Sequence, residues 1–157
     1  MDSRNRTRVH LEMPSRLEML DKAGELVGQL ADVAGFDEDS RLDIQTAAHE
    51  SLINAIVHGN RADEARRVTL EVGLDSCGLE MRVRDEGQGF DPRLVPNPLA
   101  LENLCRPSGR GILLMRALMD SVAFRRPPSG GMEVTMRKRL GRCIESGCDP
   151  NPAHADA

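Results

Sequence analysis

The sequence predicts an α+β domain, a two-layer sandwich in which helices cover one face of a mixed, mostly antiparallel sheet. The main observation is the order of the expected elements: a strand, two helices, two strands, a long loop, a helix and two strands. The second observation is the spacing of apolar residues. Three segments alternate in polarity like strands, and one segment repeats apolar residues at helical spacing. The length of 157 residues fits one domain with a real core.

The first half of the chain is expected to form one strand and two helices. Residues 7–12 alternate in polarity, which indicates a strand. A second helix is expected from about residue 39 to residue 58, closed by Gly59 and Asn60 at its C-terminal cap. Between them a helix over residues 16–34, ended by Gly35, is predicted from the helical spacing of Leu17, Leu20, Ala23, Leu26, Val27 and Leu30.

The second half is expected to supply four strands and one helix. Two segments that alternate in polarity flank a hairpin turn at Cys77 and Gly78. Further on, a turn rich in Pro and Gly separates two closing strands. The expected ranges are strands at 67–74, 79–84, 121–126 and 132–140, and a helix at about 109–119.

Two segments show little periodicity. Residues 87–108 contain four prolines, and loops of this length inside a compact domain are usually functional lids or disordered. We expect residues 92–108 to form a mobile lid. The tail from residue 141 to residue 157 is rich in Gly, Pro, Asp and Asn and is expected to be disordered. The folded domain is therefore predicted to span residues 1–140.

Composition argues against several classes of function. The formal net charge of −4 provides no basic surface for nucleic acid. With no Trp or Tyr and three Phe, the chain can hardly stack on single-stranded bases, and its core must be aliphatic. No apolar run approaches the ~18 residues of a membrane span, and the polar N-terminus does not resemble a signal peptide. We therefore expect a cytoplasmic protein with no direct nucleic acid or membrane partner.

The four cysteines do not form a recognisable metal or disulfide pattern. Cys77, Cys105, Cys143 and Cys148 include no Cys-x-x-Cys pair, and free thiols are expected in a reducing cytosol. A zinc site made by Cys143, Cys148 and His154 would have unusual ligand spacing, so the sequence does not favour it.

The second predicted helix carries a carboxylate and an amide on one polar arc. Glu50 and Asn54 lie four residues apart and therefore project from the same face, together with Asp43 and Ala47. An amide oxygen suits Mg²⁺, and a carboxylate one turn away can accept a proton from a hydroxyl group or a water. The alternative is a solvated face without a function. The residues expected to enter the core from the opposite side are Leu42, Thr46, Ile53, Ile56 and Val57.

A glycine-rich turn follows the strand predicted to end near Arg84. Asp85 comes first, and Gly87 and Gly89 follow at alternate positions, where glycine permits a close approach of a ligand. The carboxylate can accept a hydrogen bond from an exocyclic amine such as that of adenine. The alternative is an ordinary turn with a capping Asp.

A second glycine-rich turn precedes the third predicted helix. Gly109, Arg110 and Gly111 follow Ser108, and backbone N–H groups at a helix start attract phosphate, to which Arg110 would add charge. The alternative is an ordinary N-cap by Ser108. Neither this turn nor the earlier one matches the P-loop or the Rossmann fingerprint.

Taken together, the three runs resemble the N, G1 and G2 boxes of the Bergerat-fold ATPases, the superfamily of gyrase, Hsp90, MutL and histidine kinases. The nearest resemblance is to small bacterial anti-sigma factor serine/threonine kinases. Residues 50–59 are similar to their Glu-x-x-x-Asn-Ala-x-x-His-Gly helix, and residues 109–120 are similar to their second glycine box. The resemblance covers roughly residues 7–140 and implies the Bergerat ATP-binding fold.

The resemblance also implies a role for individual residues. Glu50 would be the general base toward a protein serine or threonine, and Asn54 would hold Mg²⁺ against the phosphates of ATP. Asp85 would bind the adenine amino group. The adenine wall would be shaped by Gly87 and Gly89, and the phosphates would be lined by Gly109, Arg110 and Gly111.

The implied function is that of an anti-sigma factor kinase. Such a protein holds a sigma factor inactive and uses ATP to phosphorylate an antagonist protein; members of the family often form homodimers. An alternative is a binding module that keeps the fold but transfers no phosphate. Glu50 and Asn54 favour the kinase. Met132 favours the binding module, because the family usually has Thr after the glycine at position 131, and its hydroxyl lies close to the nucleotide.

Overall fold

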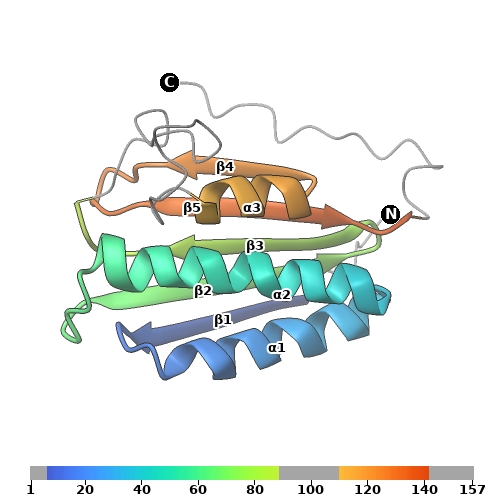
Figure 1. Ribbon diagram of the computed structural model, residues 1–157, viewed down its shortest axis with the longest axis horizontal. Helices are drawn as coiled ribbons and strands as arrows, with labels where there is room; N and C mark the ends of the chain where they lie inside the picture. The colour runs from blue at the N-terminus through green and yellow to red at the C-terminus, as the bar shows by residue number, and fades with distance from the viewer. Residues whose placement is uncertain (1–6, 89–109, 142–157) are drawn as a thin grey trace.

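The computed structural model describes residues 7–88 and 110–141, which form a five-stranded sheet with its helices on one face (Figure 1). The strand order is β1-β2-β3-β5-β4, and all four pairings are antiparallel. The predicted α+β sandwich is therefore confirmed. In chain order the elements are β1 (Thr7–Pro14), α1 (Met19–Ala34), α2 (Glu38–Ile53), the π-helix η1 (Asn54–Gly59), β2 (Arg67–Asp75), β3 (Gly78–Arg84), α3 (Arg110–Leu118), β4 (Ser121–Arg125) and β5 (Glu133–Arg139).

The strands follow the alternation seen in the sequence. Every second residue of β2 and β3 points toward the helices and is buried, while the intervening residues lie on the opposite, charged face of the sheet. Contacts on that face include the ion pair of Arg137 with Asp75 at 3.0 Å and a hydrogen bond between His10 and Glu71 at 3.2 Å. The core is aliphatic, as composition requires, and its fully buried methionines are Met13, Met81, Met115 and Met136.

The first helix begins three residues later than expected. The N–H of Arg16 donates to the carbonyl of Pro14, and that of Met19 donates to the carbonyl of Arg16, so a tight turn precedes α1. Leu17 lies in this turn and is 57% exposed, although its spacing suggested a core position. Gly35 does end the helix, in the left-handed conformation with φ of 95°.

The expected core face of α2 was only partly right: Ile56 is buried and Ile53 packs against the core, but the other three residues are exposed. Leu42 is 49% exposed, and Thr46 and Val57 are also exposed. The buried side consists mainly of small residues that let α2 approach the sheet, with α1 and α3 packed on either side of it. Apolar residues occur all round this helix, so their spacing alone does not identify the buried side. The residues buried along α2 and η1 are Ile44, Ala47, Ala48, Ser51, Leu52, Ala55 and Ile56.

Several sequence-based expectations lie outside the described residues. These are the lid at 92–108, the tail at 142–157 and every cysteine except Cys77, which is buried. Within residues 7–88 and 110–141, no helix is both long and apolar enough to cross a membrane.

Candidate functional site

The predicted site residues that lie in the described part of the chain gather at one end of the sheet. Here η1, the end of β3 and the connection between β4 and β5 lie together, at the left end of the sheet in Figure 1. Three glycines from these segments allow the approach. A Cβ atom on Gly59 would lie 2.3 Å from Oδ2 of Asp85, one on Gly131 would lie 2.0 Å from the Asp85 carbonyl oxygen, and one on Gly87 would lie 1.9 Å from the Gly59 carbonyl oxygen. Any side chain at these positions would force the segments apart.

Asp85 lies at the centre of this contact and is only 4% exposed. Its backbone N–H donates to the carbonyl of Met132 at 3.0 Å. Its Oδ1 atom accepts from the backbone N–H groups of Gly87 at 2.9 Å and Met132 at 3.2 Å. Within the described residues no hydrogen bond reaches Oδ2. One carboxylate oxygen is thus fixed by the backbone, and the other faces Gly59 without a hydrogen-bond donor from the described residues.

Burial raises the pKa of the Asp85 carboxyl above its ordinary value. The N–H groups of Gly87 and Met132 act in the opposite direction, as do the charges of Arg66 and Arg84. A carboxylate that is costly to ionise without a ligand gains from a hydrogen-bond donor placed against Oδ2.

Glu50, Asn54 and Gly111 form the second part of the site. A Cβ atom on Gly111 would lie 2.7 Å from Oε2 of Glu50 and 3.7 Å from Nδ2 of Asn54. The N-terminal turn of α3 is therefore packed against the face of α2 that carries both polar side chains, which are half-buried. Arg110 is exposed at the first position of α3. Gly89 and Gly109 lie outside the described residues.

Asp43 lies on the same arc as Glu50 and Asn54, as expected, but its contacts are with other residues. The Nζ atom of Lys138 lies 3.1 Å from Oδ2 of Asp43 and also donates to the carbonyl of Leu118 at 2.5 Å. This lysine links β5 to α2 and to the end of α3, so Asp43 has a structural role. Ala47, the other member of the arc, is fully buried.

The second helical stretch ends at Gly59 with Asn60 as its C-cap, as expected, but Gly59 does not adopt the left-handed conformation of a usual glycine cap. Asn54 begins η1, a wide turn in which the N–H of Asn60 donates to the carbonyl of Ala55, five residues earlier, at 2.8 Å. Left-handed backbone occurs not at Gly59 but at Arg61 and Ala62, with φ of 53° and 54°. Glycine is required at position 59 because of Asp85, and not because of a cap.

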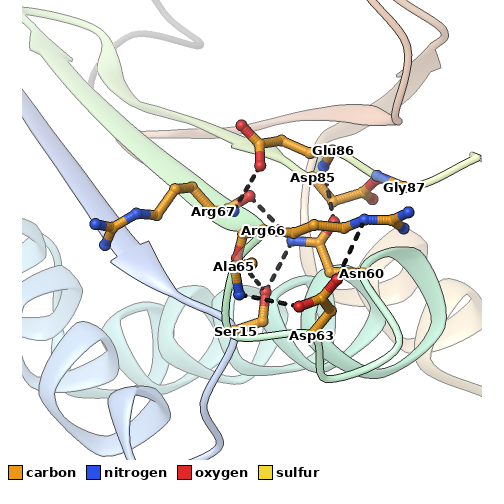
Figure 2. A network of polar contacts seen from close by, with 9 residues as sticks. All are labelled: Ser15, Asn60, Asp63, Ala65, Arg66, Arg67, Asp85, Glu86 and Gly87. Atoms are coloured by element: carbon orange, nitrogen blue, oxygen red, sulfur yellow. Dashed lines mark hydrogen bonds and ion pairs between the residues drawn. The ribbon is translucent and has the colours of Figure 1, made fainter.

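No local sequence pattern indicates the role of Asn60, whose side chain is fully buried between three strand ends (Figure 2). Its Nδ2 atom donates to Oγ of Ser15 at 2.9 Å and to the carbonyl of Arg67 at 3.0 Å. Its Oδ1 atom accepts from the N–H of Glu86 at 2.8 Å. Gly-Asn is also a common helix C-cap, and this local pattern does not indicate the tertiary contacts of Asn60.

Met132 departs from the family pattern, and the structure shows where its side chain goes. It is 2% exposed and belongs to the hydrophobic core. Its N–H and carbonyl both bond to Asp85, so the backbone at this position keeps a role in the site after the hydroxyl of the usual Thr is lost.

The fold and the position of these residues define a histidine kinase-like ATPase domain. The model of that family matches residues 13–138, and the chain belongs to it. The chain is 26% identical over 139 residues to the serine-protein kinase RsbW of Listeria innocua, and the aligned region covers 85% of this chain and 87% of the relative. It is 32% identical over 107 residues to the anti-sigma F factor of Oceanobacillus iheyensis, covering 66% and 73% respectively. These relatives place the chain in the family of anti-sigma factors and RsbW-like kinases.

A solved structure gives the same fold. The crystal structure of the RsbU and RsbW domains of Rv1364c from Mycobacterium tuberculosis superposes with a TM-score of 0.63 at 18% identity. The match covers 85% of this chain and 32% of that chain. At this identity, the similarity shows the fold alone.

Proposed function

We propose that the chain is an ATP-dependent anti-sigma factor kinase, and that it binds adenine through Asp85. The observation that carries the proposal is the state of this carboxylate: it is buried, Oδ1 is held by two backbone N–H groups, and no donor among the described residues reaches Oδ2. An exocyclic amino group would supply the missing donor. The glycines around Asp85 let the backbone of the neighbouring segments approach the carboxyl group directly, which fixes its position.

Asn54 and Glu50 would act on the phosphates and on the phosphate acceptor. The carboxamide oxygen of Asn54 is a suitable ligand for Mg²⁺, which when bound would offset the negative charge of the phosphates. Glu50, one turn earlier, would accept the proton of a serine or threonine hydroxyl of the antagonist. The half-buried position of both side chains beside α3 supports these roles. Gly87, Gly89, Gly109, Arg110 and Gly111 would complete the pocket around the nucleotide.

The proposed partners are a sigma factor and a small antagonist protein, in the cytoplasm. The relatives named serine-protein kinase and anti-sigma F factor support both halves of this function. A phosphate group adds up to about two negative charges at a contact surface, enough to disrupt an interface through repulsion and desolvation. Phosphorylation would in this way release the antagonist and leave the sigma factor bound.

The direct test is to incubate the chain with γ-labelled ATP, Mg²⁺ and the cognate antagonist. We expect label on a serine or threonine of the antagonist, and a Glu50→Gln chain run beside it identifies contaminating kinases. A wild-type chain that binds the sigma factor but never labels the antagonist would overturn the kinase proposal. The chain would then be a binding module.

A further inference from the structure

Two consecutive residues at the end of η1 hold the three residues that follow β3. Gly59 lies against Asp85 and Gly87 so closely that neither contact tolerates a Cβ atom. Asn60, the next residue, accepts a hydrogen bond at 2.8 Å from the N–H of Glu86. The end of the helix that carries Glu50 and Asn54 is thereby joined to the turn that carries Asp85.

The side chain of Asn60 closes a ring with β2. Its Nδ2 atom donates to the carbonyl of Arg67, and the N–H of Arg67 donates to Oε2 of Glu86 at 2.7 Å. Each of these three residues therefore bonds to the other two (Figure 2). The second bond from Nδ2 goes to Ser15, just beyond the end of β1, and the hydroxyl of Ser15 donates to the carbonyl of Arg66 at 2.7 Å.

We infer that Asn60 is a positioning residue for adenine recognition, and that it acts through the peptide group between Asp85 and Glu86. This inference rests on the proposed role of Asp85. The N–H held by Asn60 belongs to that peptide group. The orientation of the peptide group sets the direction in which the Asp85 side chain leaves the backbone. A buried amide whose nitrogen donates two hydrogen bonds and whose oxygen accepts one holds such a geometry firmly, because the alternative is an unpaired polar group away from water.

Base selectivity is the property that separates this role from a merely structural one. Inosine triphosphate has a carbonyl oxygen where ATP has the amino group, and the phosphates of the two nucleotides are identical. A misdirected Asp85 carboxylate weakens the binding of ATP but not that of inosine triphosphate. General loosening of the fold weakens the binding of both nucleotides. The ratio of the two dissociation constants is therefore the quantity to measure.

Calorimetry with both nucleotides and Mg²⁺ should be run on the wild-type chain and on Asp85→Asn, Asn60→Ala, Asn60→Asp and Ser15→Ala chains. We expect Asn60→Ala to reduce the preference for ATP by about tenfold, the effect of losing a well-oriented hydrogen bond to a charged group. Ser15→Ala is the comparison variant, because it removes one bond from Nδ2 of Asn60 and leaves the bond to Glu86 in place, and its preference should fall by less than that of Asn60→Ala. Asn60→Asp loses the donor bonds of Nδ2 but retains an acceptor for the N–H of Glu86, and it should keep more of the preference than Asn60→Ala.

The outcomes separate the inference from the proposed function. If Asn60→Ala weakens the binding of both nucleotides equally, the positioning role is overturned. If that chain does not fold, as thermal unfolding will show, loss of the preference in a folded Asn60→Asp chain would overturn it instead. A wild-type chain without any preference for ATP, or an Asp85→Asn chain that retains it, contradicts the role of Asp85 itself.

Discussion

Gly111 and Glu50 are so close that a Cβ atom on Gly111 would lie 2.7 Å from Oε2 of Glu50. The glycine at the start of α3 therefore limits the space available to the Glu50 carboxylate. This role is separate from the proposed contact of Gly111 with phosphate. A proton acceptor must be within hydrogen-bond reach of the hydroxyl that it serves, so the position of this carboxylate matters for transfer.

We predict that Gly111→Ala slows phosphate transfer by about ten- to a hundredfold, because a displacement of about 1 Å at a reacting group can have an effect of this size. The helix itself should not suffer, since Ala favours helix over Gly. The measurement is single-turnover transfer at saturating ATP. Leu113→Ala, a change at a partly exposed position of the same helix, serves as the control. Transfer at the wild-type rate in Gly111→Ala would show that Glu50 has room to adapt.

Glu50→Gln tests the general base directly. The change is nearly isosteric and lies on a half-buried face, so folding, nucleotide binding and sigma factor binding should be retained. Phosphate transfer should fall by ~10²–10⁴-fold, the usual contribution of a positioned base. The lower end is expected, because phosphoryl transfer depends mainly on positioning and charge stabilisation. A variant that phosphorylates the antagonist as fast as the wild type would exclude Glu50 from this role.

The strands and the first helix were predictable because their patterns are strong. In β2 the burial of every second residue follows directly from the alternating sequence. In α1 the fully buried Ala23, Val27 and Ala31 repeat at steps of four. The face of α2 was not predictable in this way. Its buried side depends on Ala47 and Ala48, whose small side chains give little hydrophobic signal, while Leu42 is exposed.

The candidate site was predictable as a set of motifs but not as a set of contacts. Glu50 and Asn54 share a face because of helix geometry, which the sequence encodes locally. The contact of Gly59 with Asp85 and the bond from Glu86 to Asn60 join residues 26 positions apart. Nothing local distinguishes a glycine required by such packing from one that only ends a helix, so the sequence predicts the helix end at these residues and not their contacts with the turn after β3.

Asn54→Ala should weaken nucleotide binding only when Mg²⁺ is present. A neutral amide oxygen contributes to the affinity for phosphates mainly by holding the cation between them. We expect the wild type to bind ATP more tightly with Mg²⁺ than with a chelator, and the variant to lose that difference. Calorimetry in the two buffers provides the test. Equal affinities of the wild type with and without Mg²⁺ would argue against a metal ligand at this position.

Asp85→Asn should reduce ATP affinity without reducing the stability of the free protein. An amide can present its NH₂ group to the adenine amino group, which converts an attraction into a repulsion, and about a tenfold loss is expected. The amide oxygen can still accept from Gly87 and Met132, and the cost of a buried charge disappears. Competition of ATP with GTP and thermal unfolding of the free chains measure the two effects. A strongly destabilised variant would assign Asp85 to the fold instead.

The raised pKa of Asp85 predicts how pH affects both stability and binding. Because burial raises this pKa in the folded chain, the carboxyl group favours folding below its unfolded pKa, and this contribution is lost as pH rises through the folded pKa. The stability of the wild type relative to Asp85→Asn should therefore decrease with rising pH over that window. Chemical denaturation of both chains at a series of pH values measures it.

Nucleotide binding should show the opposite dependence. The adenine amino group donates to the ionised carboxylate, so ATP affinity should fall as pH is lowered through the raised pKa of Asp85. Inosine triphosphate provides the matched control, because its phosphates titrate in the same way as those of ATP. Its carbonyl oxygen, in contrast to the amino group of ATP, can accept a hydrogen bond from the neutral Asp85 carboxyl group. Its affinity relative to that of ATP should therefore rise as pH falls. A ratio of the two affinities that does not change with pH would show that Asp85 does not contact the base.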